Sequence, residues 1–307
     1  MKKRILIVVL LAVLAAGTLV YFAFPGLMYR ANIGFSRCRA GLDRKGVQVS
    51  DHMIAYLEGG EGPAVVLLHG FGSEKDHWNR FAKHLTPRYR VIIPDIPGFG
   101  ESSKIPAASY DIKKQAARIE DFCAIMGLEK FHLAGNSMGG FIAGVVAAEI
   151  PGKILSLCLI DSSGVPSPRK SEFQLALQNG ENPLLVNSVE GLDRMFALNF
   201  NTPPAVPMPV KIILTKKAID SRAFNRKVER DRINHPLDLR PLLGRITAPV
   251  LIIWGDDDRV LDKSAIPVLQ KGLARSTAVI IKDCGHVPLF EKPEETAKHY
   301  LYFLEKR

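Results

Sequence analysis

Short apolar runs rich in valine, isoleucine and leucine recur along the chain from about residue 46 onward. The runs are continuous rather than alternating, which is typical of strands covered on both faces in a parallel sheet. Segments with helical periodicity, such as Ile112–Met126 and Met138–Ile150, separate them. The runs are Ala64–Leu68, Val91–Ile93, Phe131–Ala134, Ile154–Ile160, Val250–Trp254 and Ala278–Ile281. The pattern predicts an α/β fold, a mostly parallel sheet with helices on both faces.

Two earlier strands, near Val47–Ser50 and Met53–Glu58, are expected to begin the sheet as an antiparallel hairpin and to bring it to eight strands. Between Ile160 and Pro249 no buried strand is evident, and amphipathic stretches such as Leu184–Phe200 occur instead. That segment is far too long for a structureless loop inside a compact domain. We therefore expect an α/β core over residues 46–160 and 249–307, interrupted by a helical insertion over 161–248.

The N-terminus carries a long uncharged apolar run. Lys2, Lys3 and Arg4 precede Ile5–Phe24, a stretch long enough as a helix to cross the roughly 30 Å of hydrocarbon in a bilayer. We expect a retained membrane anchor over residues 1–24, followed by a basic linker over 25–45. The alternative is a signal peptide cleaved near Ala15, although the apolar part of such peptides runs only about 7–15 residues.

Charge narrows the choice of partners. The net charge is +10, but the excess forms no basic and aromatic stripe, and no nucleic-acid-binding signature is present. An anionic membrane surface is the better candidate, and Lys211–Arg232 is the segment where basic residues are densest. The four cysteines form no CxxC pair, so the sequence indicates neither a metal site nor a disulfide framework.

One apolar strand ends in a serine placed between glycines. The strand ending at Ala134 is followed by Gly135-Asn136-Ser137-Met138-Gly139 and then by a helical segment. This strand, turn and helix are typical of a strained elbow that presents a nucleophilic Ser137 hydroxyl. The alternative is a glycine-rich turn with an incidental N-cap serine. The glycine spacing does not fit a nucleotide-binding loop.

A serine nucleophile needs a base and a carboxylate behind it. His286 follows the last predicted strand, where a loop at the carboxyl edge of the sheet would carry it over the serine. Asp256, Asp257 and Asp258 follow the preceding strand, and the order serine, aspartate, histidine is the one expected for this architecture. Chemistry alone leaves the choice among them open, and Asp161, at the end of an earlier strand, is a reserve candidate.

The same chemistry needs hydrogen-bond donors for the oxyanion of the tetrahedral intermediate. His69-Gly70-Phe71-Gly72 follows the strand Ala64–Leu68, so the backbone N–H of Phe71 can act together with the N–H of Met138. We interpret His69 as a structural residue that shapes this loop.

Four motifs in order carry a resemblance to the α/β-hydrolase superfamily over Val47 to Arg307. They are His69-Gly70-Phe71-Gly72, Asp95 to Ser102, Gly135 to Gly140 and Gly285-His286. Together with the N-terminal apolar run, Trp254 to Asp258, Val260-Leu261-Asp262 and Cys284-Gly285-His286 resemble membrane-bound monoacylglycerol lipases and Moraxella-type bacterial lipases. The resemblance implies that Asp258 is the acid, that the insertion is a cap domain, and that Asp95 and Ser102 hold a loop.

The serine excludes some members of the superfamily, because haloalkane dehalogenases and epoxide hydrolases carry aspartate at the elbow. Carbon–carbon bond hydrolases, cofactor-free haloperoxidases and non-catalytic binding proteins of the same fold remain as alternatives. We expect a membrane-anchored serine esterase that acts on lipid-like esters such as monoacylglycerols through Ser137, Asp258 and His286. It should need no metal or organic cofactor. Its catalytic domain is expected outside the cytoplasm if the source is bacterial, with the orientation left open by basic residues on both sides of the apolar run.

Overall fold

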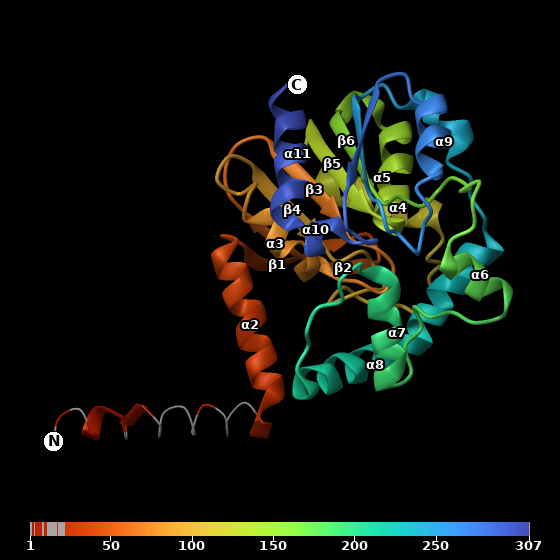
Figure 1. Cartoon of the computed structure of the whole chain (residues 1–307). Helices are drawn as coiled ribbons and strands as arrows, with labels where there is room; N and C mark the ends of the chain where they lie inside the picture. Colours follow the sequence, from red (N-terminus) through yellow and green to blue (C-terminus); the bar gives the residue numbers. More distant parts are fainter. Residues whose placement is uncertain (1, 3, 8, 11–16, 18–21, 307) are drawn as a thin grey trace.

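An eight-stranded sheet with the order β1-β2-β4-β3-β5-β6-β7-β8 forms the centre of the molecule (Figure 1). The structure is a computed structural model that describes residues 2, 4–7, 9, 10, 17 and 22–306. Pairs β1–β2 and β2–β4 are antiparallel and all others are parallel, which confirms the predicted sheet and its opening hairpin. The strands are β1 (Asp43–Val49), β2 (His52–Gly59), β3 (Ala64–Leu68), β4 (Arg90–Pro94), β5 (Phe131–Asn136), β6 (Ile154–Ile160), β7 (Val250–Gly255) and β8 (Ser276–Ile281).

Helices cover both faces of the sheet, so each central strand is buried on both sides. In β3, Val66 and Leu68 enter one apolar core, and Val65 and Leu67 enter the other. This is why the strand is apolar at every position. The first core packs under α4 (Ile112–Ile125), α5 (Met138–Glu149) and α9 (Ala265–Gly272), and the second under α3 (Asn79–Ala82) and α11 (Pro293–Glu305). Shorter elements are η1 (Lys75–Trp78), η2 (Pro151–Lys153), η3 (Arg240–Arg245) and α10 (Pro288–Glu291).

Between β6 and β7 the described chain is helical and contains no strand. It forms α6 (Glu172–Gln178), α7 (Val189–Asn199) and the long α8 (Met208–Asn234), which Figure 1 shows grouped at one end of the sheet. Pro207 ends the preceding extended segment and Pro209 lies in the first turn of α8, where a missing N–H breaks no helical hydrogen bond. This is the segment predicted as a helical insertion.

A helix, α2 (Pro25–Arg39), occupies most of the range expected to be a basic linker. It runs from the core to the start of α8 (Figure 1). Near its start, Lys217 Nζ of α8 lies 5.7 Å from the centre of the Tyr29 ring. Near its end, Arg37 makes hydrogen bonds of 2.7 and 2.6 Å to the two carboxylate oxygens of Asp76. The helix therefore bridges the core and the inserted helices.

The apolar run Ile5–Phe24, expected to be a membrane anchor, lies largely outside the residues that the structure describes. Within the described part of the chain, no helix combines the length and the apolar character needed to cross a membrane.

The basic stretch of α8 is partly neutralised by neighbouring carboxylates. Lys216 pairs with Asp220 at 2.7 Å on the exposed face of the helix. Lys217 Nζ lies 2.6 Å from both carboxylate oxygens of Glu74, in the loop that follows β3. The second pair joins α8 to the core. The Lys217 charge is therefore neutralised within the protein and is not free to contact a membrane.

A buried ammonium group organises the loops beyond β3 and β4. Lys75 is fully buried, and its Nζ lies 2.7 Å from Asp95 Oδ2 and 2.8 Å from Glu101 Oε2. The Asp95 carboxylate also accepts hydrogen bonds from the Lys75 and Glu101 backbone N–H groups. Ser102 Oγ donates to Asp95 O at 2.7 Å, so Asp95 and Ser102 hold this loop as the resemblance implies.

Removing the Lys75 charge should leave Asp95 buried without its counter-ion. We expect Lys75→Ala to lower the free energy of unfolding by about 3–5 kcal/mol. Lys216→Ala removes an equal charge from an exposed pair and should cost less than about 1 kcal/mol. Denaturant unfolding of both variants measures the difference, and equal costs would contradict a dominant role for the buried pair.

Candidate active site

Ser137 occupies a strained turn between β5 and α5. Its φ of 56° and ψ of −119° are unfavourable for a residue with a side chain, and such strain is typical of a nucleophile elbow. The Ser137 N–H donates to Ile160 O at 3.0 Å, and Ser137 O accepts from the N–H groups of Phe141 and Ser163, each at 3.1 Å. Hydrogen bonds from the sheet, the helix and the loop after β6 therefore hold the turn.

Two glycines let the elbow close. A Cβ atom at Gly135 would lie 2.2 Å from Gly139 O, and one at Gly139 would lie 2.3 Å from Leu68 O. Any side chain at either position would push α5 away from the sheet. The turn therefore depends on these glycines.

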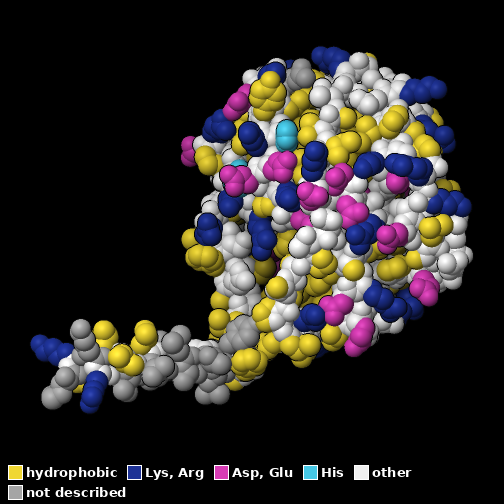
Figure 2. Space-filling view, viewed as in Figure 1, with side chains coloured by type: hydrophobic (Ala, Val, Ile, Leu, Met, Phe, Trp, Pro, Cys, Tyr) yellow, Lys and Arg dark blue, Asp and Glu magenta, His cyan; other side chains and the backbone are white. Residues whose placement is uncertain are grey.

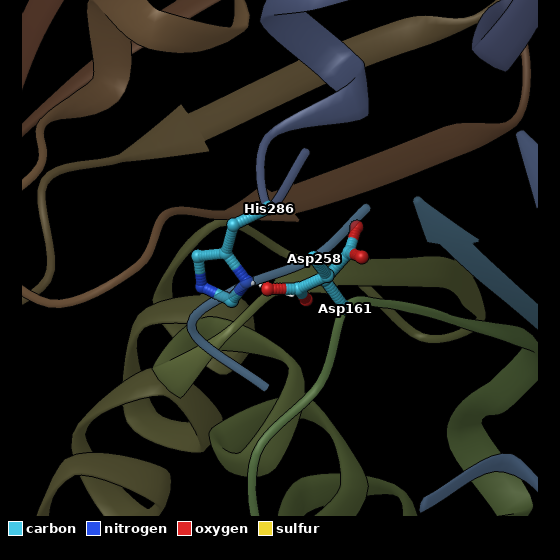
Figure 3. A group of neighbouring side chains, drawn as sticks. All are labelled: Asp161, Asp258 and His286. Carbon is cyan, nitrogen blue, oxygen red and sulfur yellow. Dashed lines mark hydrogen bonds and ion pairs between the residues drawn. The ribbon is translucent and has the colours of Figure 1, made fainter. Parts of the chain in front are cut away.

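His286 and Asp258 form a buried pair on neighbouring loops at the carboxyl edge of the sheet (Figure 3). His286 Nδ1 lies 2.8 Å from Asp258 Oδ2. The other Asp258 oxygen accepts hydrogen bonds from Val260 N at 2.8 Å and Leu261 N at 2.9 Å. With Nδ1 donating to the carboxylate, Nε2 of the neutral ring is left to accept a proton.

The neighbouring aspartates have other partners. Asp256 Oδ1 accepts from Cys284 N at 3.3 Å, and Asp257 Oδ2 accepts from Arg259 Nη2 at 2.8 Å. Of these three aspartates, Asp258 is the one hydrogen-bonded to His286 in the described part of the chain. This agrees with the position that the resemblance implies.

Asp161 lies beside this pair as a second, fully buried carboxyl group. Its Oδ1 accepts from Gly255 N at 2.9 Å, and its Oδ2 has no hydrogen-bond acceptor or donor assigned among the described residues. Burial, followed by the charge of Asp258, raises the pKa of Asp161 well above its usual value. The protonated form of Asp161 is therefore favoured more than it is for an exposed aspartate.

Side-chain atoms of Asp161, Asp258 and His286 all lie within 4.8 Å of one another, close enough to share a metal ion. Asp258 Oδ2 and His286 Nδ1 are already hydrogen-bonded to each other at 2.8 Å. The raised pKa of Asp161 disfavours the ionised carboxylate that a metal ion would need, so the cluster is better suited to acid–base chemistry.

The residue before the nucleophile positions the histidine loop. Asn136 Nδ2 donates to His286 O at 3.1 Å and to Ile160 O at 3.2 Å, a role that no pattern in the sequence indicates. His286 N donates to Asn199 O at 2.8 Å, so the end of α7 also holds the loop. Among the described residues, Ser137 Oγ has no hydrogen-bond partner. Such contacts often form only when substrate binds.

The backbone donors expected for an oxyanion lie beside Ser137. A Cβ atom at Gly70 would lie 3.2 Å from Ser137 Cβ, which places the loop after β3 against the elbow. In the described part of the chain, neither Phe71 N–H nor Met138 N–H has a hydrogen-bond acceptor. Met138 is also the first residue of α5, whose N-terminal dipole favours negative charge.

His69 has the structural role expected of it. Its Nδ1 lies 2.8 Å from Gly70 O, and its Nε2 accepts from Ile96 N at 3.0 Å. Burial lowers the pKa of His69, so the ring is neutral and both nitrogens are used in shaping the loop.

Comparison with known proteins agrees with the observed fold. The family model for the α/β-hydrolase fold matches residues 63–192 and 216–293. Lipase 3 of Moraxella sp. is 34% identical over 88% of this chain and 87% of its own length. The human monoacylglycerol lipase ABHD6 is 29% identical over 97% of this chain and 95% of its own.

A solved structure is similar along the whole chain. The crystal structure of a membrane phospholipase A, described as a novel bacterial virulence factor, is 46% identical with a TM-score of 0.91. The match covers 100% of this chain and 99% of that one. The resemblance to bacterial lipases and monoacylglycerol lipases is therefore confirmed, and the chain belongs to the α/β-hydrolase fold family.

Proposed function

We propose that the protein is a serine carboxylic-ester hydrolase that acts on lipid-like esters, with monoacylglycerols as the first substrates to test. The observation that carries the proposal is the hydrogen bond of 2.8 Å between Asp258 and His286, next to the strained turn of Ser137. Acyl transfer also needs donors for the oxyanion. The backbone N–H groups of Phe71 and Met138, which have no acceptor among the described residues, can supply them.

In the proposed reaction, Ser137 Oγ attacks the acyl carbon while His286 Nε2 takes the hydroxyl proton. His286 then gives this proton to the departing alcohol oxygen, which leaves an acyl-enzyme. A water molecule, deprotonated by His286, releases the fatty acid and restores Ser137. Asp258 stabilises the imidazolium in both steps, and the Phe71 and Met138 N–H groups stabilise the oxyanion. Loss of one such donor costs about 10²–10³ in rate.

Lipid esters are the favoured substrates because the similar proteins are named as lipases, a monoacylglycerol lipase and a phospholipase. We also propose that residues 161–248 form a cap over an α/β core made of 46–160 and 249–307. A carbon–carbon bond hydrolase would use the same three side chains. A substrate panel that includes a meta-cleavage diketone beside acyl esters separates the two activities.

A membrane location is proposed on sequence and surface grounds. The apolar run Ile5–Phe24 is long enough to act as an anchor. Figure 2 shows apolar side chains gathered where the N-terminal segment meets the main body. Exposed apolar side chains at the starts of α2 and α8 are Leu27, Met28, Met208 and Ile212. Apolar contact, more than the partly paired lysines of α8, is therefore the expected means of membrane contact.

Ser137→Ala should abolish ester hydrolysis and labelling by a fluorophosphonate probe, because both reactions need the activated hydroxyl. The fold should be retained, since the backbone contacts of the elbow are unchanged. Gel detection of the label, beside a circular dichroism spectrum, measures both. Full labelling of the alanine variant would contradict the assignment.

The two buried carboxyl groups should respond in opposite ways to amide substitution. Asp258→Asn should lower kcat by about 10⁴, because the amide cannot stabilise the charged His286. Asp161→Asn should keep most activity, because its amide imitates the protonated carboxyl group. An active Asp258→Asn enzyme together with an inactive Asp161→Asn enzyme would reverse the assignment.

Stability gives an independent measure of the protonation of Asp161. Because its pKa is raised in the fold, its contribution should weaken as the pH rises above the ordinary value of 3.8. Asparagine does not titrate, so the stability of Asp161→Asn relative to the wild type should increase as the pH is raised through this range.

The full chain should sediment with membranes and resist extraction by high salt or carbonate, because an apolar anchor inserts more firmly than a surface patch adheres. Deletion of residues 1–24 should release an active soluble protein. Recovery of the wild-type chain in the soluble fraction, with a new N-terminus near Ala16, would instead indicate a cleaved signal peptide.

A further inference from the structure

Glu291 ends the single-turn helix α10, which follows directly on the histidine loop. A hydrogen bond of 3.0 Å from Glu291 N to Val287 O closes this turn. The turn brings the side chain back to the loop, where Glu291 Oε2 accepts a hydrogen bond of 2.8 Å from Gly285 N. The carboxylate therefore holds the backbone immediately before His286.

The same carboxylate also binds the chain that follows α7. Thr202 N donates to Glu291 Oε1 at 2.8 Å, and Asn201 N donates to Oε2 at 3.3 Å. One oxygen thus binds the inserted segment alone, and the other is shared with the histidine loop. Hydrogen bonds to an ionised carboxylate are stronger than those between neutral groups. Glu291 therefore joins two segments that lie far apart in the sequence.

Backbone packing brings these two segments into direct contact. A Cβ atom at Gly285 would lie 2.5 Å from Asn199 O and 2.8 Å from Phe200 Cα. His286 N donates to Asn199 O at 2.8 Å. The centres of the Phe290 and Phe200 rings are 5.7 Å apart, with the rings edge to face. The end of α7 and the histidine loop therefore form one joined unit, and a displacement of either would move the other.

The position of His286 matters because its Nε2 must reach Ser137 in the chemical step. Asp258 orients the ring through Nδ1, and Asn136 binds the carbonyl group of His286. Neither contact uses the N–H groups of the loop, which are held by Glu291 and by the end of α7. A misplacement of about 1 Å in a reacting group can cost about 10²-fold in rate.

We propose that Glu291 is a positioning residue for His286, and that it makes the placement of this base depend on the chain after α7. The inference rests on the proposed esterase function and adds a residue outside the three catalytic side chains. Glu291 acts through the backbone of the loop and not on the reacting atoms. Breaking this link should therefore slow the chemical step more than it weakens substrate binding.

Glu291→Gln tests the role of the carboxylate in the full chain. Glutamine has one acceptor oxygen, so one of the two segments would face an NH₂ group that cannot accept a hydrogen bond. With a short soluble ester such as p-nitrophenyl acetate, kcat should fall by about 10- to 100-fold while KM changes by less than about 3-fold. Glu295→Gln is the matched control with unchanged kinetics, because it removes an equal charge from an exposed position in α11.

A change in the inserted segment should have a similar effect while Glu291 is kept. Thr202→Pro removes the N–H group that donates to Glu291 Oε1, whereas Thr202→Ala retains it. We expect Thr202→Pro to lower kcat by about 10-fold and Thr202→Ala to change it by less than about 3-fold. The double variant of Glu291→Gln and Thr202→Pro should lose less than the product of the two single losses, because both break the same link.

A raised KM with an unchanged kcat in Glu291→Gln would mean that the contact serves substrate binding alone, and would overturn the proposal. Losses that multiply in the double variant would do the same. The melting temperature of each variant is measured beside the kinetics. A loss of kcat that disappears well below the melting temperature would assign Glu291 to stability alone, and would also overturn the positioning role.

The hydrogen bond between His286 Nδ1 and Asp258 gives a readout that needs no substrate. Its proton should give a downfield signal in the proton NMR spectrum of the wild type. Glu291→Gln should shift or broaden this signal, and Glu295→Gln should not. Such a change would support the positioning role even if no ester were hydrolysed. An identical signal in the wild type and Glu291→Gln would contradict it.

Discussion

The close approach of α5 to the sheet at Gly135 and Gly139 is the constraint on which the rest of the structure depends. A Cβ atom at either glycine would collide with backbone oxygen, so the strand can turn into the helix only there. That turn forces Ser137 into a positive φ and leaves the first N–H of α5 unused. One steric condition therefore sets both the exposure of the nucleophile and the position of an oxyanion donor.

Two carboxyl groups with different surroundings lie at the site. Asp258 accepts hydrogen bonds from two backbone N–H groups and contacts His286, whereas Asp161 accepts from one backbone N–H group and is fully buried. Burial and the neighbouring Asp258 raise the pKa of Asp161. The carboxyl group that accepts more hydrogen bonds is therefore the one next to the imidazole ring, where the reaction needs a negative charge.

Local patterns in the sequence were enough to predict the sheet, its opening hairpin and the serine elbow, because continuous apolar runs and paired glycines each have one simple structural cause. Spacing could not select the acid among three adjacent aspartates, since their hydrogen-bond partners come from distant loops. It also gave no sign that Asn136 holds the histidine loop, because that contact joins segments far apart in the chain.

Helix α2 acts as a spacer of defined length and rotation. About 18 Å of this helix separate its apolar start at Pro25 from Arg37, which binds Asp76 near the loop after β3. Inserting a single residue would rotate one end by about 100° relative to the other, so Tyr29 could no longer face Lys217 while Arg37 kept its carboxylate. The helix thus fixes both the distance and the angle between the start of α8 and the loop that contains Asp76.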